Sequence, residues 1–145
     1  MKAQYGFLMA CSLACAAALA SPSERTGMAP QREHGVSYLC GGIGSSEAAQ
    51  MKREASNYNL MLTFAENTGA YLADVNVAIS DLRGKEVLQT TCDGPILLVK
   101  FPRAGSYRVK AEINGHAINK VVQVDRSSRG AAVALLWPRR LIERG

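Results

Sequence analysis

The sequence predicts a mainly β protein in which a short N-terminal helix precedes a seven-stranded antiparallel sandwich. From Asn59 to Trp137 the apolar residues recur at every second position, which is the period of a half-buried strand. Turn-forming residues separate nearly every pair of these runs, at a spacing of roughly ten residues, and no helix-length segment intervenes. Short strands at regular spacing are typical of a sandwich rather than of a fold that alternates strands and helices.

Residues 1–20 have the features of a cleavable signal peptide. Lys2 supplies an early positive charge, an apolar stretch runs from Phe7 to Leu19, and a small-x-small pattern ends at Ala20. We therefore expect cleavage between Ala20 and Ser21 and a mature protein that is periplasmic or secreted. The apolar stretch is shorter than the roughly 20 residues that a transmembrane helix needs, so we expect no transmembrane segment in the mature chain.

Acylation of a leader cysteine is an alternative to simple cleavage. Cys11 and Cys15 each follow an alanine, and a lipid on either residue would anchor the chain to a membrane. Cleavage before Cys15 would place Ser12 where a branched apolar residue is preferred, and cleavage before Cys11 would leave a very short apolar core. We therefore favour simple cleavage, with the lipid anchor as the minority alternative.

Removal of the leader would leave 125 residues, enough for one domain with a single core. This mature chain would carry sixteen Lys and Arg against twelve Asp and Glu, a net charge of +4. Residues 138–145 form a basic tail, which either meets acidic envelope surfaces or is simply solvated. The arginines near the C-terminus are Arg126, Arg129, Arg139, Arg140 and Arg144. Export makes nucleic acid a poor candidate partner.

Two cysteines, Cys40 and Cys92, would remain in the mature chain. An even pair in an oxidising compartment predicts one disulfide. A bridge over this span would stabilise the fold by about 4 kcal/mol on the chain-entropy model. Two separate buried thiols are the alternative. The mature chain has no C-x-x-C motif, so nothing supports a thioredoxin-like redox role.

Two segments are expected between the leader and the sandwich. Residues 21–36 contain proline, glycine and scattered charges without apolar periodicity, which predicts a flexible linker. Residues 37–57 begin as a glycine-rich loop and continue as a short amphipathic helix. Its apolar stripe, which should pack on the domain, comprises Ala48, Met51, Ala55 and Tyr58. Ser45 and Ser46 are candidate N-caps, and Glu47 adds negative charge at the positive end of the helix dipole.

The sandwich is expected over residues 58–137. Its seven predicted strands lie at residues 59–64, 72–80, 86–91, 96–101, 107–113, 118–124 and 131–137. The intervening turns include Leu82-Arg83-Gly84-Lys85, Asp93-Gly94-Pro95, Pro102-Arg103-Ala104-Gly105 and Asn114-Gly115. Asn-Gly between alternating runs is the strongest of these signals, because the usual two-residue hairpin turn needs a positive φ at both positions.

Several of these segments have a further pattern in common. They are Val75-Asn76-Val77-Ala78-Ile79-Ser80-Asp81 with its turn at Gly84, Cys92-Asp93-Gly94, the run from Phe101 to Val109, and Asn114-Gly115. Together, over about residues 59–124, they resemble the carboxypeptidase regulatory-like domain. That family carries a V-x-V/I-x-D-x-x-G hairpin, a D-G turn and a proline-x-x-G-x-Y-x-V strand entry. The chain departs from this pattern at Cys92, where threonine is common, and at Pro95.

The resemblance implies a transthyretin-like (prealbumin-like) Greek-key sandwich that acts as a noncatalytic accessory module, often beside peptidases or envelope receptors. Tyr38-Leu39-Cys40-Gly41-Gly42 and the following helix suggest a bacterial exported subgroup whose function the family does not indicate. Four glycines fit turn positions at which a positive φ is expected: Gly84, Gly94, Gly105 and Gly115. Tyr107 should bury its ring while its hydroxyl reaches a backbone partner.

No catalytic or metal-binding constellation is evident in the sequence. His34 and His116 are expected to be exposed, and neither has a metal-ligand partner at suitable spacing. The glycine-rich loop lacks the GxxxxGK[ST] phosphate motif. The chain also lacks the tyrosine-arginine-glycine-serine ending of the hydroxyisourate hydrolases, which share the transthyretin-like sandwich. Trp137 should be buried rather than form a sugar-binding platform. We therefore expect no metal, no cofactor and no enzyme activity.

These observations favour an exported, noncatalytic binding or accessory module of the bacterial cell envelope. Its expected partner is another envelope protein, and the exposed edge strands of the sandwich are the candidate binding sites. Two alternatives stay open: a structural envelope protein that self-associates, and a hydrolase of unrecognised type. For a hydrolase, the charged residues near strand ends are Asp74, Asp93 and Arg108.

Overall fold

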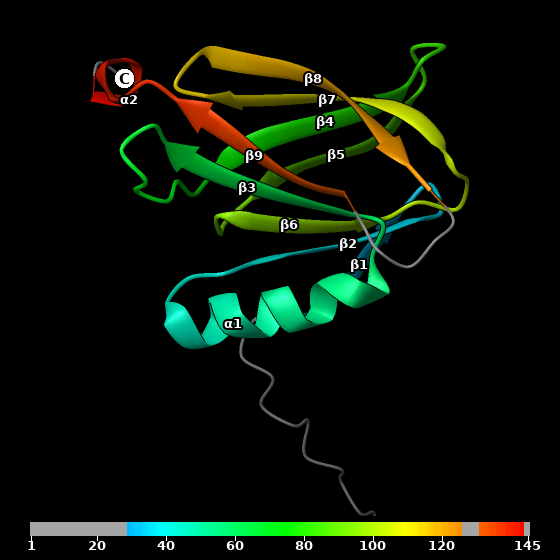
Figure 1. The fold of residues 1–145 in the computed structure, drawn as a ribbon. Coiled ribbons are helices and arrows are strands. Elements are labelled where there is room, and N and C mark those ends of the chain that lie inside the picture. The colour runs from blue at the N-terminus through cyan, green and yellow to red at the C-terminus, as the bar shows by residue number, and fades with distance from the viewer. Residues whose placement is uncertain (1–28, 126–130, 144–145) are drawn as a thin grey trace, which may run out of the picture.

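Two β-sheets pack face to face, and a helix covers part of the outer side of the larger sheet (Figure 1). The computed structural model describes residues 29–125 and 131–143. The predicted leader, with Cys11, Cys15 and the Ala20–Ser21 cleavage site, therefore lies outside the described residues, as do Arg126, Arg129 and Arg144. Within the described part of the chain, no helix is both long and apolar enough to cross a membrane.

Sheet A has the strand order β1-β2-β6-β3-β9. Its strands are β1 (Gln31–Glu33), β2 (Val36–Gly41), β3 (Leu60–Glu66), β6 (Ile96–Lys100) and β9 (Ala131–Trp137). Sheet B has the order β5-β4-β7-β8. It comprises β4 (Val75–Asp81), β5 (Glu86–Cys92), β7 (Gly105–Ile113) and β8 (His116–Val124). The helices are α1 (Ser45–Glu54), the 3₁₀ turn η1 (Ala55–Asn57) and α2 (Arg139–Glu143), which lies in the predicted basic tail.

The mainly β prediction is confirmed, but the seven-stranded, fully antiparallel arrangement is wrong. All seven predicted strands form, and β1 and β2 bring the number in the described residues to nine. These two strands occupy parts of the predicted linker (21–36) and glycine-rich loop (37–57). In addition, β9 runs parallel to β3, so that Leu60 lies opposite Ala131 and Glu66 opposite Trp137.

The sequence pattern missed β2 because both faces of this strand are buried. Val36 and Tyr38 point into the core between the sheets, whereas Leu39 packs under α1. A strand covered on both faces loses the apolar-polar alternation that marks a half-buried strand. The β1–β2 turn is His34-Gly35, with positive φ angles of 50° and 80°. His-Gly is a weaker hairpin signal than Asn-Gly, although it adopts the same backbone region here.

The main core lies between the two sheets and contains the inward-facing residues of their strands. Trp137 at the end of β9 is only 1% exposed, as predicted, and packs near Phe64 with a ring-centroid distance of 6.4 Å. Its indole Nε1–H donates a 3.0 Å hydrogen bond to the His116 carbonyl. This bond joins β9 of sheet A to the start of β8 in sheet B and satisfies the one polar atom of the buried indole.

Helix α1 packs on the outer face of sheet A through the predicted apolar stripe. Met51 and Tyr58 are buried against Leu39, Ile96 and Leu98, which confirms the predicted role of the stripe. The predicted serine cap is wrong, because the N-cap is Gly44 at a φ of 82° and no side chain caps the helix there.

Candidate functional site

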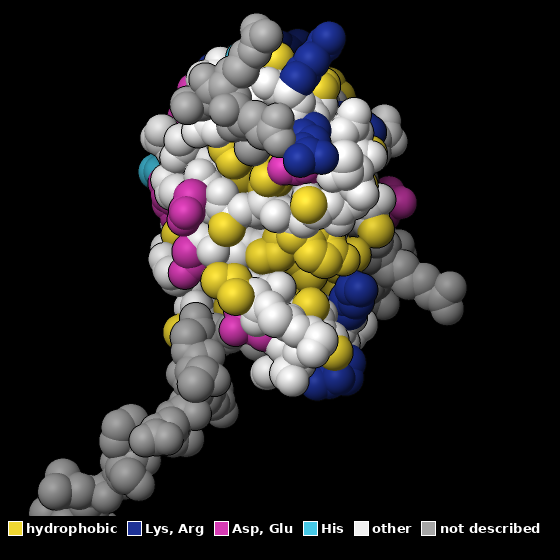
Figure 2. All heavy atoms as spheres, turned by 90° about the vertical axis from the view of Figure 1, so that its left-hand side faces the viewer, with side chains coloured by type: hydrophobic (Ala, Val, Ile, Leu, Met, Phe, Trp, Pro, Cys, Tyr) yellow, Lys and Arg dark blue, Asp and Glu magenta, His cyan; other side chains and the backbone are white. Residues whose placement is uncertain are grey.

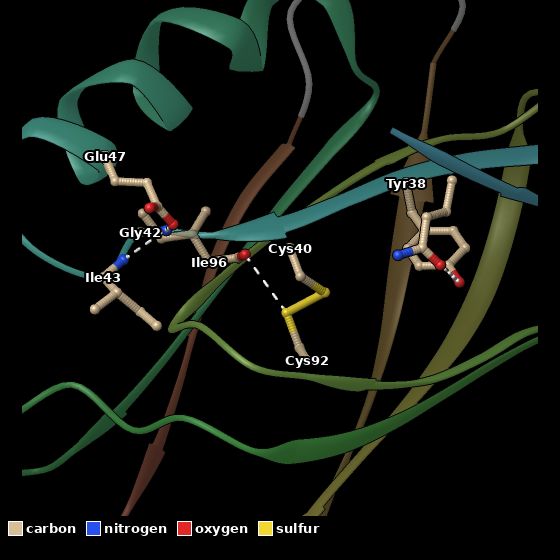
Figure 3. The surroundings of a disulfide bond; sticks show 8 residues. Tyr38, Cys40, Gly42, Ile43, Glu47, Cys92 and Ile96 are labelled. Carbon is tan, nitrogen blue, oxygen red and sulfur yellow. Dashed lines mark hydrogen bonds between the residues drawn. A yellow bond between two sulfur atoms is a disulfide. The ribbon is translucent and has the colours of Figure 1, made fainter. Parts of the chain in front are cut away.

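Glu47, in the first turn of α1, binds the backbone of the glycine-rich loop that precedes this helix. Its Oε1 accepts hydrogen bonds from the backbone N–H groups of Gly42 (2.9 Å) and Ile43 (3.4 Å), as Figure 3 shows. The carboxylate therefore occupies donors that an anionic ligand would need. This arrangement gives the loop a structural role and provides no support for a phosphate site.

Cys40 and Cys92 form a disulfide between β2 of sheet A and β5 of sheet B (Figure 3). Their Cα atoms are 5.5 Å apart, within the usual range for a bridge. Cys92 is fully buried, and its sulfur lies 3.6 Å from the Ile96 carbonyl oxygen. The structure therefore favours the predicted bridge over two separate thiols, and both sulfurs serve to join the sheets.

Three of the four predicted turn glycines have the expected backbone angle. Gly84, Gly105 and Gly115 have φ values of 91°, 153° and 80°. Gly94 does not have a positive φ, so the reason predicted for it is wrong. Instead, a Cβ at Gly94 would overlap the carbonyl group of Gly41, and glycine is needed there because two backbones approach closely.

Tyr107 has the predicted combination of a buried ring and a bonded hydroxyl. The ring stacks on Phe101 at a centroid distance of 4.1 Å, and the hydroxyl donates a 2.7 Å hydrogen bond to the Arg103 carbonyl. Burial raises the pKa of Tyr107 above its ordinary value, the nearby Asp81 raises it further, and Arg103 opposes this shift. The tyrosine thus anchors the β6–β7 loop to the core.

The structure does not bring the three candidate hydrolase residues together. Asp74 and Asp93 flank the paired residues Val75 and Cys92, at one end of the β4–β5 pair. Arg108 lies opposite Ser80, about 17 Å from Val75 along the strand at the usual rise per residue. All three side chains are exposed.

Neither predicted histidine belongs to a cluster of metal-ligating residues. His34 is exposed and lies 3.7 Å from the Glu33 carboxylate, whereas His116 is half-buried rather than exposed as predicted. Over residues 29–125 and 131–143, no three His, Cys, Asp or Glu residues lie close enough together to hold a metal ion.

Two of the hollows on the described surface are lined in part by polar side chains. One, of about 550 Å³, lies where the β1–β2, β4–β5 and β6–β7 turns meet, and its rim includes His34, Asp81, Lys85 and Arg103. Asp81 Oδ1 is already occupied by the backbone N–H groups of Arg83 and Lys85, each at 2.9 Å. The rim therefore mixes opposite charges, and its one carboxylate is engaged in holding a turn.

The second hollow, of about 400 Å³, lies on the outer face of sheet B over β5, β4 and β7. The register places the small Ala78 between Gln89 and Lys110, so longer side chains surround a low centre. Lys110 and Glu112 are within 4.0 Å of each other, and Thr91 donates to Asn76. This polar face satisfies much of its hydrogen-bonding capacity internally.

The edge strand β9 differs from the other three sheet edges in its lack of charge. β1 is three residues long and contains Arg32 and Glu33, β5 begins with Glu86, and β8 contains Lys120. Edge strands that carry charges resist pairing with other chains. β9 has seven residues, all apolar, and among the described residues no strand pairs with its side away from β3.

Hydrogen bonds at the two ends of β9 define which backbone groups are free. The Ala131 N–H donates to the Asn59 carbonyl, and the Trp137 carbonyl accepts from the Asn67 N–H, both at 2.9 Å. In a parallel ladder, alternate residues bond to the neighbouring strand. The odd-numbered residues of β9 therefore bond to β3, and the N–H and C=O groups of the other three point to the open edge. These three residues are Ala132, Ala134 and Leu136, and all are exposed.

The side chains of these three residues continue an apolar surface on the outer face of sheet A. The register places them beside Met61, Thr63 and Ala65 of β3. Tyr71, which bridges to Ala65 from the other side, and Leu136 are 59% and 52% exposed. The carboxyl ends of β3 and β9 lie at the left of Figure 1, and Figure 2 shows hydrophobic side chains gathered at mid-height on that end.

We call Ala132, Ala134 and Leu136 the β9 edge triad. The sequence prediction identified the strand but not the triad, because periodicity reveals neither the neighbour of a strand nor its open side. The available signal was the absence of charge from Ala131 to Trp137.

Comparison with known proteins adds no relative: no protein-family model matches the chain, and no curated protein matches it. The resemblance to the carboxypeptidase regulatory-like domain therefore stays a prediction. The case for function depends on the geometry of the described residues.

Proposed function

We propose that the protein is an exported, noncatalytic binding module of the bacterial cell envelope that accepts a strand of a partner protein at β9. The observation that carries this proposal is the seven-residue edge strand without a charged residue or a proline. Charges and prolines are the usual means by which an edge strand avoids pairing. Their absence here, at an open edge, favours an edge that is used for binding.

The chemistry of the edge matches an extended polypeptide. The β9 edge triad offers three N–H and three C=O groups at the spacing of an added strand, and its apolar side chains would contact alternate residues of that strand. Main-chain hydrogen bonds then supply affinity, and the apolar side chains supply selectivity. A small ligand could form hydrogen bonds with only a few of these six backbone groups, whereas an added strand could bond to all of them.

The same proposal includes export of the protein and membership of the carboxypeptidase regulatory-like family. The leader pattern supports export, and the disulfide supports an oxidising compartment such as the periplasm. The two-sheet arrangement and the β4–β5 and β7–β8 hairpins are compatible with a divergent carboxypeptidase regulatory-like module of transthyretin-like topology. Accessory modules of this kind commonly act by binding.

In-cell photocrosslinking tests the proposal. A photoreactive amino acid is placed at Leu136 on β9 and, as a matched control, at Val121 on β8, since the two side chains are 52% and 55% exposed. We expect a crosslinked product of discrete mass from position 136 and not from position 121. Peptides recovered from the product should map to one extended segment of the partner.

Ala134→Pro provides the decisive comparison, because it removes an N–H that β3 does not use. It should abolish the crosslink from position 136 while the melting temperature stays close to that of the parent protein. Ala134→Lys, which adds a charge at the same edge, should act in the same direction. Absence of the product, equal products from both positions, or a product that survives both substitutions in folded protein would overturn the proposal.

A further inference from the structure

We infer that the added strand runs antiparallel to β9 and carries an acidic side chain immediately before its apolar residues, where it meets Arg140. This inference rests on the proposed function, since it assigns the direction and the chemistry of the partner segment. The ligand is thus an extended peptide with an acidic N-terminal flank and apolar residues at alternate positions.

The direction follows from the energetics of strand pairing. Antiparallel ladders are slightly more stable per residue than parallel ones. An antiparallel strand on the β9 edge triad begins beside Trp137 and ends beside Ala131. The N-terminal flank of the partner therefore lies next to Pro138, Arg139 and Arg140.

Positive charge is concentrated at that end of β9. Arg139 and Arg140 are exposed and, with Asn67 and Pro138, line a surface hollow of about 460 Å³. The Asn67 side-chain oxygen accepts a 3.4 Å hydrogen bond from the Arg139 backbone N–H. The backbone N–H of Asn67 donates to the Trp137 carbonyl. The backbone that carries the arginines is therefore attached to the end of the β3–β9 pair rather than left as a loose tail.

The Arg140 guanidinium forms no ion pair with a side chain that the structure describes. Glu66 lies opposite Trp137 in the register, and its carboxylate accepts a 2.9 Å hydrogen bond from the Thr68 hydroxyl. A carboxylate on the first residues of the partner would meet the guanidinium of Arg140, which can bind it through two parallel N–H groups.

The charge pattern also argues against a second copy of the chain as the occupant. Two β9 strands paired antiparallel would each bring Arg139 and Arg140 toward the start of the other strand. The sequence places Arg126 and Arg129 within the five residues before that start. These five residues include no carboxylate, so a second β9 would bring no acidic residue immediately before its apolar run, and a strand with an acidic residue there fits this edge better.

Three capped peptides test the inference against the purified full chain. Their sequences are Glu-Glu-Val-Thr-Val-Thr-Val, Val-Thr-Val-Thr-Val-Glu-Glu and Lys-Lys-Val-Thr-Val-Thr-Val, each with an acetylated N-terminus and an amidated C-terminus. Binding is measured by NMR titration, and strand addition by hydrogen exchange at the amides of the β9 edge triad. These amides should exchange rapidly in the free protein and slowly in the complex.

The peptide with leading glutamates should bind about three- to tenfold more tightly than either of the others, the range expected for one or two exposed ion pairs. Arg140→Gln should remove most of this preference, whereas Arg83→Gln in the distant β4–β5 turn should leave it unchanged. The preference should also decrease as salt is raised from 50 to about 500 mM, because exposed charges are screened.

The outcomes separate this inference from the function on which it rests. If the three peptides protect the triad equally, or the trailing glutamates are preferred, the edge binds strands and the inference about direction and charge is overturned. If no peptide slows exchange at the triad, the proposed function fails with it. A concentration-dependent dimer that protects the triad without peptide would identify a second copy as the occupant and overturn the inference.

Discussion

At Gly94 the requirement for glycine comes from space, whereas at Gly84 it comes from backbone angle. Gly94 lies against the Gly41 carbonyl, and a Cβ would overlap that rigid group. Gly84 has a φ of 91° but open space around its Cα. The Gly41–Gly94 contact brings the end of β2 against the turn before β6, next to the disulfide.

Gly94→Ala should therefore destabilise the protein by about 2–3 kcal/mol, in the range of overpacked sites. Gly84→Ala should cost about 1–2 kcal/mol, the penalty for a side chain in the left-handed region. Urea unfolding of both variants measures the two losses. An equal or smaller loss at Gly94 would show that the two backbone segments can separate at little cost.

Tyr107 and Tyr58 give the protein a dependence on alkaline pH. Burial raises the pKa of both phenols above their ordinary value, and Glu54 adds to the shift at Tyr58. A raised pKa in the folded state means that the fold holds the proton more tightly than the unfolded chain. The resulting stability is fully present below the ordinary pKa of about 10 and is lost as the pH rises through the folded-state pKa.

The free energy of unfolding should thus decline above about pH 10, and Tyr107→Phe should make this decline shallower. At pH 7 the same variant should be less stable by about 1 kcal/mol, because the bond to the Arg103 carbonyl is lost. Unfolding experiments between pH 7 and 11 compare the two proteins. Lysines titrate in the same pH range in both proteins, so both should lose stability. If the free energy of unfolding fell equally steeply with pH in the parent protein and in Tyr107→Phe, Tyr107 would contribute nothing to the decline.

At the scale of elements, the sequence was most informative where a strand has one face in the core and one in water. β4, β5 and β7 have this pattern, and their predicted bounds are within three residues of those observed. β2 was missed because α1 covers its outer face, and β1 because it is short and polar. Both failures come from tertiary contacts that a local pattern does not contain.

The pairing of β9 shows a second limit of prediction from the sequence. Its apolar run predicted a strand correctly, but periodicity is the same for parallel and antiparallel neighbours. The parallel direction appears only in the structure, where Leu60 lies opposite Ala131 and Glu66 opposite Trp137. The proposed site depends on this pairing, since the open side of β9 exists only because β3 occupies the other. The strand was predictable from sequence, whereas its open side was not.

The cover that α1 forms over sheet A depends on few side chains, of which Met51 is fully buried. Met51→Ala should reduce stability by about 2–5 kcal/mol, the range for large-to-small changes in a core. Lys52→Ala, on the exposed side of the same helix, should change it by less than about 0.5 kcal/mol. Denaturant unfolding measures both. If the two losses were similar, the packing of α1 on sheet A would contribute little to the stability of the fold.

At the scale of the whole molecule, the two long sides of the sandwich are closed by different means. On the side of β2 and β5, the disulfide joins the sheets covalently. On the side of β9 and β8, the link is the Trp137 hydrogen bond to the His116 carbonyl together with packing in the core. The permanent bond therefore lies on the side away from the proposed docking edge, which leaves the backbone of β9 available to a partner.

This division predicts what reduction of Cys40–Cys92 does. The native wild-type protein should lose about 4 kcal/mol of stability on reduction, because a bridge of this span restricts the unfolded chain. Guanidinium unfolding of oxidised and reduced protein measures the loss without any cavity from substitution, and Cys40→Ala/Cys92→Ala should be no more stable than the reduced protein. Amide exchange at Ala132, Ala134 and Leu136 should stay the same in reduced, still folded protein, because these amides have no bond to break at the open edge. A large change there would mean that the bridge and the β9 edge are coupled through the core, and the edge could then not be treated as a separate binding element.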